Sequence, residues 1–117
     1  MSMLPNRFDV EQNGPVVTAT LRSPEVAHED MQSLMQECID KIRYEKAQNF
    51  VFDLDEVEFL ASACIGTLVE LLQEVEHCRG QIALVNCKED VAFLFKVTRL
   101  DQVFAMFDDI EEALENL

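Results

Sequence analysis

The sequence predicts one α/β domain with a mixed, mostly parallel β-sheet and the element order β-β-α-β-α-β-α-β-α. Short apolar, β-prone segments alternate with longer segments of helical apolar periodicity, which is typical of crossover connections between parallel strands. The 117 residues suit a single domain, 1–117, that buries a core without disulfides or metal ions. No repeat, linker or low-complexity segment divides the chain.

Two strands joined by a tight turn are expected first. Phe8–Val10 and Val16–Leu21 are β-prone, and Thr18 and Thr20 alternate with apolar residues as on a half-buried strand. The intervening Gln12–Pro15 contains Asn-Gly followed by Pro, in which Asn and Gly tolerate positive φ. The opening hairpin adds antiparallel pairing to the sheet.

An amphipathic helix follows. Glu29 and Asp30 near its start and Lys41 and Arg43 near its end suit the helix dipole. Its apolar stripe repeats at helical spacing and consists of Met31, Leu34, Met35, Cys38, Ile39 and Ile42.

Buried strands are expected at Phe50–Leu54 and Ile82–Val85, with a weaker one at Val103–Met106. Between the first two, Ala63–Cys78 has a helical stripe, and Gly80 is expected to end that helix in the left-handed conformation. The stripe is Cys64, Leu68, Leu71, Leu72, Val75 and Cys78.

Two shorter helices complete the pattern. One surrounds Val91, Leu94 and Phe95. The terminal one has Asp108 or Asp109 as its N-cap. Its expected buried stripe is Ile110, Ala113, Leu114 and Leu117.

The charge balance narrows the classes of partner. The chain has 23 acidic residues against nine lysines and arginines, for a formal net charge of −14. Such a field repels nucleic-acid phosphates and anionic lipid, so we expect no nucleic-acid binding and no membrane insertion. It favours basic protein surfaces, although acidic residues also serve to keep a small domain soluble.

The cellular compartment follows from the N-terminus and the cysteines. Met1–Arg7 lacks the apolar region of a signal peptide, and no segment approaches the roughly 20 apolar residues of a membrane span. The four cysteines form no CxxC pair and have no histidine at metal-ligand spacing. We therefore expect a cytoplasmic protein without a metal site, with Cys38, Cys64 and Cys78 as buried, reduced thiols.

Catalytic templates are not matched. With only Gly14, Gly66 and Gly80, the chain can build neither a P-loop nor a dinucleotide-binding fingerprint. His28 and His77 are the only histidines, and no nucleophile-elbow pattern is present. We assign no catalytic residue and no cofactor, and we expect a protein that is not an enzyme.

Carboxylates cluster directly after the first buried strand, at Asp53, Asp55, Glu56 and Glu58. Ligand sites of α/β sheets lie beyond the carboxyl ends of strands, so this is where a site is expected. The cluster could bind Mg²⁺, meet a basic partner or form a solvated loop. It therefore also leaves open the hypothesis of an enzyme or a ligand-binding domain. No EF-hand spacing is present.

The most informative segment follows the acidic loop. Phe59-Leu60-Ala61-Ser62-Ala63-Cys64-Ile65-Gly66 places small residues at the opening of an amphipathic helix, with Ser62 where an N-cap belongs. This run resembles Phe-Ile-Asp-Ser-Ser/Thr-Gly-Leu-Gly, the signature of STAS domains, which include anti-sigma-factor antagonists and sulphate-transporter tails. The resemblance extends over Phe50–Leu68, Gly80–Asn86, Val91–Phe95, Leu100, Val103-Phe104, Phe107–Asp109 and Glu112–Leu114. Because the predicted element order also agrees with that of the family, the resemblance covers essentially the whole chain.

The resemblance implies a function and a switch. In the antagonist branch, the first Ser of the run accepts phosphate from a partner, a GHKL-type serine kinase that is also the anti-sigma factor. Ser62 matches that position, so it is the expected phosphoacceptor of a bacterial transcription regulator. The implied partner surface comprises Asp55, Glu56, Glu58, Ala61, Ser62, Ala63, Cys64, Gly66, Thr67, Glu70 and Glu74.

The sequence departs from the family pattern at several positions. Ala61, Ala63 and Cys64 replace the usual Asp, Ser/Thr and Gly, and Arg22–Val26 replaces the turn that usually follows the second strand. These departures favour an alternative, a STAS adaptor of a lipid-transport or signalling-scaffold complex that is never phosphorylated. In that case Ser62 serves only as a helix cap. The oligomeric state is left open.

Overall fold

The computed structural model describes residues 7–117. The elements are β1 (Phe8–Asn13), β2 (Val16–Leu21), α1 (His28–Tyr44), β3 (Asn49–Asp53), α2 (Ser62–His77), β4 (Ile82–Val85), α3 (Glu89–Val97), the 3₁₀ helix η1 (Leu100–Gln102), β5 (Ala105–Phe107) and α4 (Ile110–Asn116). The order of strands and α-helices confirms the predicted one.

The strands form one five-stranded sheet in the order β1-β2-β3-β4-β5. β1 and β2 pair antiparallel through a turn at Gly14, whose φ of 61° is one that glycine adopts without strain. The remaining pairs are parallel, as the alternation of strands and helices predicts. Thr20 pairs with Asp53, and Asp53 pairs with Val85, so the carboxyl ends of β2, β3 and β4 lie side by side.

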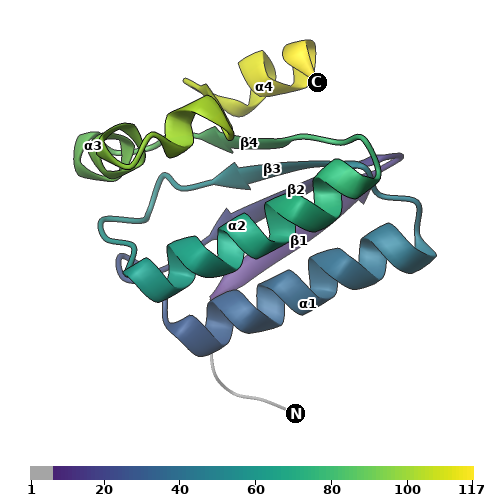
Figure 1. The fold of residues 1–117 in the computed structure, drawn as a ribbon, viewed down its shortest axis with the longest axis horizontal. Helices are drawn as coiled ribbons and strands as arrows, with labels where there is room; N and C mark the ends of the chain where they lie inside the picture. Colours follow the sequence, from purple (N-terminus) through teal and green to yellow (C-terminus); the bar gives the residue numbers. More distant parts are fainter. Residues whose placement is uncertain (1–6) are drawn as a thin grey trace.

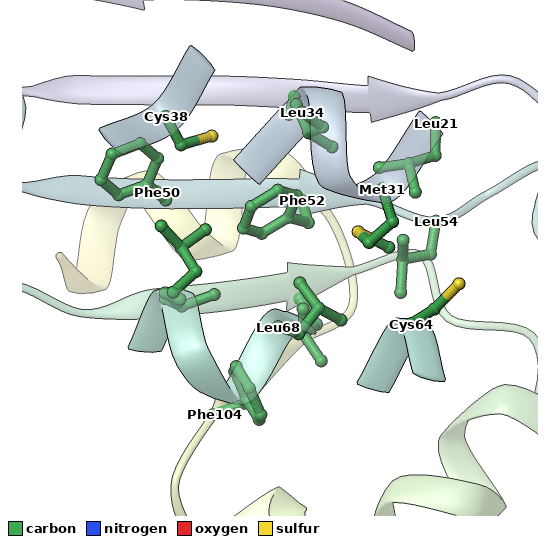
Figure 2. Close-up of a cluster of buried hydrophobic side chains, with 14 of the residues drawn as sticks. Leu21, Met31, Leu34, Cys38, Phe50, Phe52, Leu54, Cys64, Leu68 and Phe104 are labelled. Carbon is green, nitrogen blue, oxygen red and sulfur yellow. The ribbon is translucent and has the colours of Figure 1, made fainter. Parts of the chain in front are cut away.

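Both faces of the central strands are buried. Phe50 and Phe52 of β3 point to a core shared with α1 and α2, which lie next to each other along one face of the sheet (Figures 1 and 2). Val51 points to the opposite face, where α4 contributes Ala113. This explains why the central strands are nearly continuous apolar runs.

α3 extends the larger core. Val91 and Phe95 of α3 are buried in it, and Phe95 meets Phe104 edge to face, with ring centroids 5.7 Å apart.

In the part of the chain from residue 7 to residue 117, no helix has the length and apolar character needed to cross a membrane.

The end of α2 differs from the prediction in one detail. Arg79, not Gly80, takes the left-handed conformation, with φ of 62°. The N–H of Gly80 donates to the carbonyl of Val75 at 2.9 Å, and the N–H of Arg79 donates to that of Glu76 at 3.0 Å, which is a Schellman motif. Gly80 is needed for space instead, because a Cβ there would lie 1.8 Å from the backbone oxygen of Gln48.

The C-terminal elements are also shifted. β5 begins at Ala105, two residues after the predicted start, because η1 continues into a turn in which the N–H of Phe104 donates to Leu100 at 2.9 Å. Asp109 is the N-cap of α4, as predicted, and its side chain accepts from the N–H of Glu112 at 2.8 Å. Leu114, expected in the buried stripe, is 48% exposed, because only the side of α4 that carries Ala113 is buried against the sheet.

Candidate functional site

The loop between β3 and α2 is anchored at its start by Asp53. Its Oδ1 accepts from the N–H of Asp55 and from the side-chain amide of Asn86, both at 3.1 Å. The N–H of Leu54 donates to the carbonyl of Val85 at 3.0 Å. These bonds join the carboxyl ends of β3 and β4, so Asp53 has a structural role and the exposed acids follow it.

The second half of the loop is held against the segment before α1. The N–H groups of Glu58 and Phe59 both donate to the carbonyl of Pro24, at 2.7 and 3.0 Å. Phe59 also forms an isolated parallel bridge with Glu25. Val57 and Leu60 are buried on either side, so the loop reaches α2 in a fixed path.

α2 begins one residue earlier than an N-cap at Ser62 requires. Ala61 is the N-cap, with extended φ and ψ of −70° and 155°, and it makes no side-chain capping bond. Ser62 is therefore not the cap but the first helical residue, and its side chain is exposed. The first N–H groups of a helix lack intrahelical partners, so the hydroxyl lies at a helix end that favours negative charge.

Small exposed residues surround this hydroxyl. Ala63 and Gly66 are exposed on the first turns of α2, and Ala61 is half-buried. A Cβ built at Gly66 would meet nothing within 4 Å. Since glycine inside a helix costs about 0.5–1 kcal/mol relative to alanine, packing within the domain does not account for Gly66.

Two residues expected on the partner surface are buried instead. Cys64 is fully buried, and its thiol donates to the carbonyl of Val26 at 3.3 Å. Burial raises the pKa of Cys64 and keeps the thiol neutral. Thr67 is 6% exposed and donates to the carbonyl of Ala63 at 3.0 Å, because its position falls beside the apolar stripe.

The remaining residues of the expected surface are accessible. Glu70 and Glu74 extend it along the solvent side of α2, and the loop contributes three further exposed acids, Asp55, Glu56 and Glu58. The structure thus brings together all the predicted surface residues except Cys64 and Thr67, whose side chains point into the domain.

Acidic residues dominate the end of the molecule where these segments meet. We call this surface the acidic end and define it as segments 22–30, 53–66 and 86–93, where β2, β3 and β4 end and α1, α2 and α3 begin (Figure 1). Acidic residues in these segments outnumber the two basic ones, Arg22 and Lys88. Arg22 is already paired with Asp9 and lies 3.8 Å from Glu56.

Metal coordination receives no support from this arrangement. Among residues 7–117, no group of three or more His, Cys, Asp or Glu side chains is placed to hold a metal ion. The carboxylates of the loop are spread along an exposed turn instead of converging on one point. What the acidic end offers is a surface of small and acidic side chains around one accessible hydroxyl.

Sequence reasoning missed three exposed apolar residues near this surface. Phe59 is 54% exposed, and Phe93 and Val97 of α3 are 62% and 56% exposed. A signal was present in the sequence: Phe93 and Val97 are four residues apart and lie off the stripe formed by Val91 and Phe95. A nine-residue helix with two apolar stripes has more apolar surface than one core contact needs.

Comparison with known proteins identifies the family. The sequence matches the STAS domain family over residues 7–113. The chain belongs to this family. Both the predicted resemblance and the predicted fold class are thereby confirmed.

Two curated relatives of this STAS domain come from species of Thermotoga. A putative anti-sigma factor antagonist homologue of Thermotoga neapolitana is 36% identical over 64 residues, which cover 55% of this chain and 57% of the relative. A putative anti-sigma factor antagonist of Thermotoga maritima is 33% identical over 73 residues, covering 62% and 65%. The chain therefore spans less than two thirds of the length of these relatives.

Solved structures show the same fold. The unphosphorylated form of the anti-sigma factor antagonist SpoIIAA superimposes with a TM-score of 0.76 at 18% identity, covering 93% of this chain and 94% of that one. The phosphorylated form of the Bacillus SpoIIAA gives a TM-score of 0.76 at 19% identity, covering 93% and 97%. The fold of that protein thus resembles this STAS domain equally well in both forms.

Proposed function

We propose that this STAS domain is an anti-sigma factor antagonist that docks through its acidic end to a serine kinase that is also the anti-sigma factor. Phosphorylation of Ser62 ends the interaction. The protein acts by binding in the bacterial cytoplasm and carries out no chemistry of its own. The observation that carries this proposal is the exposed hydroxyl of Ser62 on the first turn of α2, surrounded by small side chains.

Phosphate at this position suits the domain itself. The helix start offers free N–H groups and the positive end of the dipole, so a phosphate on Ser62 leaves the fold intact. The two forms of SpoIIAA, equally similar to this chain, agree with that expectation.

The same phosphate acts against a docked partner. It adds about −1.5 to −2 charges. It also adds bulk next to the small residues Ala63 and Gly66, against which the partner packs closely in this proposal. Steric and electrostatic repulsion therefore act together at the centre of the proposed interface, whereas a phosphate elsewhere on the domain would leave the interface open.

The test begins with the protein isolated from its native cell. Intact mass and peptide mapping of residues 61–68 are expected to find a phosphate on Ser62 that is absent from Ser62→Ala. Binding to the kinase recovered with the wild-type chain is expected to fall at least about tenfold in Ser62→Asp and to persist in Ser62→Ala.

Ser33 provides the matched control, because it is an exposed serine of α1 that lies outside the segments of the acidic end. Ser33→Asp adds the same charge and is expected to bind as the wild type does. If Ser62 stays unmodified under growth and stress alike, and Ser62→Asp retains the partner, the domain is a constitutive adaptor instead. The departures at Ala61, Ala63 and Cys64 favour that alternative.

A further inference from the structure

An apolar groove adjoins the loop that leads into α2. It encloses about 260 Å³ between the segment before α2 and one side of α3. Phe59 forms one side, and Phe93, Leu94 and Val97 form the other. The carboxylates of Glu58 and Asp90 stand at its edge.

The exposure of Phe59 is built into the fold. Its neighbours Val57 and Leu60 are buried, and its N–H is bonded to Pro24. The backbone therefore holds the ring outward on an anchored segment, so that docking would fix little further freedom of the chain.

The exposure of the α3 residues has a similar origin. Val91 and Phe95 fill the core, and the helix period then places Phe93 and Val97 on another side of α3, more than half exposed. No contact within the domain requires large apolar residues there. Adjoining exposed apolar residues with a polar edge are characteristic of interaction sites.

We propose that this groove binds a segment of the partner protein in which a bulky apolar side chain is flanked by lysine or arginine. Charge complementarity selects this occupant. Glu58 and Asp90 border the groove, Glu89 is exposed beside them, and the whole chain carries a net charge of −14. A cationic segment is attracted by this field, whereas a second copy of the chain is repelled.

The size of the groove also indicates that it accommodates side chains of a docked protein segment, not a small-molecule ligand. Pockets for small molecules usually enclose about 300–1,000 Å³ and bury most of the ligand. The present groove is smaller and open, which suits one or two side chains of a docked segment. The inference rests on the proposed function for its place in the interface, because Phe59 lies three residues before Ser62.

The test is a selection of random 12-residue peptides displayed on phage against the full chain. Peptides that prefer the wild type over a Phe93→Gln, Val97→Gln double variant are expected to contain an aromatic residue or leucine flanked by basic residues. Synthetic versions of these peptides are expected to bind the double variant at least about tenfold more weakly than the wild type. Glu58→Gln and Asp90→Gln are expected to weaken binding and to reduce its dependence on salt.

Val103 and Leu114 serve as matched controls, since they are 50% and 48% exposed and lie outside the groove. Val103→Gln and Leu114→Gln are expected to bind the peptides unchanged. Circular dichroism and the midpoint of denaturant unfolding check that the double variant is folded. The inference is overturned if the selected peptides show no basic bias, or if they bind the folded double variant as tightly as the wild type.

The two proposals can fail separately. If selected peptides bind in the groove but the kinase binds Ser62→Asp as tightly as the wild type, the groove proposal stands and the phosphorylation switch is rejected. A kinase that responds to Ser62→Asp but binds the Phe93→Gln, Val97→Gln variant normally would do the reverse.

Discussion

The two ends of α2 each have one glycine, and different constraints act on them. Gly80 follows the helix and leaves no room for a side chain, because a Cβ would lie 1.8 Å from the backbone oxygen of Gln48. Gly66 lies one turn after the start, is exposed, and has open space where its Cβ would be. The fold therefore requires a glycine at position 80, whereas it does not require one at position 66.

This contrast extends to the surrounding residues. At the C-terminal end, the side-chain amide of Gln48 donates to the carbonyls of Cys78 and Arg79 at 3.1 and 3.3 Å, so the groups that accompany Gly80 belong to the domain. At the N-terminal end, Ser62 and Ala63 are exposed, and the side-chain bond to the carbonyl of Ala63 comes from Thr67 of α2 itself, not from a separate segment. Small residues that packing does not demand indicate an external constraint, which we attribute to a docked protein.

The largest effect is expected for Gly80→Ala. The new methyl group collides with backbone, and Gln48 cannot retreat easily because its own N–H is bonded to Pro15 at 2.8 Å. We expect the free energy of unfolding to fall by about 3 kcal/mol, the upper range for overpacking. Urea denaturation measures it, and a loss below about 1 kcal/mol would show that Gly80 is not sterically required.

Gly66→Ala is expected to act in the opposite direction. Replacing an exposed helical glycine by alanine stabilises by about 0.5–1 kcal/mol, since no atom obstructs the methyl group. The same denaturation experiment reports it, with Gly80→Ala as the comparison. Partner binding is expected to weaken despite the gain in stability, whereas a destabilised Gly66→Ala would contradict the proposed difference between the two ends.

A smaller effect separates Ser62 from a true helix cap. Ser62→Ala is expected to change the free energy of unfolding by less than about 0.5 kcal/mol, because Ser62 is exposed and does not cap α2. Asp109→Ala removes the capping bond of α4 and is expected to cost about 1 kcal/mol. Equal losses in the two variants, measured by thermal unfolding, would restore a capping role for Ser62.

Much of the fold could be predicted because the pattern is strong where elements are buried. Phe50–Phe52 and Ile82–Val85 are uninterrupted apolar runs, and their alternation with segments of helical periodicity is consistent with only one class of topology, a mostly parallel sheet. Apart from the exposed Leu114 of α4, the errors of the fold prediction lie at element ends. The prediction placed the left-handed residue at Gly80 because glycine adopts that conformation most easily, but Arg79 adopts it. Gly80 is needed instead for the close approach of Gln48, a contact between residues distant in sequence.

The candidate site was predictable only in part. The family signature located Ser62, and chain order placed the acidic loop at the carboxyl end of β3. The helical periodicity predicted that Thr67 lies on the solvent side of α2. Thr67 is buried instead, because the first turns of α2 pack over a wider arc than the apolar stripe alone. The groove between Phe59 and Phe93 depends on the positions of two separate segments, which no local pattern contains.

The strand order has a consequence for how the protein is made. Every strand pairs with the strand next to it in sequence, so the growing sheet can add one strand at a time as the chain leaves the ribosome. The face containing Val51, Ala83 and Val85 is covered only when α4 supplies Ala113. Until then the nascent chain presents an apolar sheet face to the cell, and α4, which emerges after the five strands, closes it.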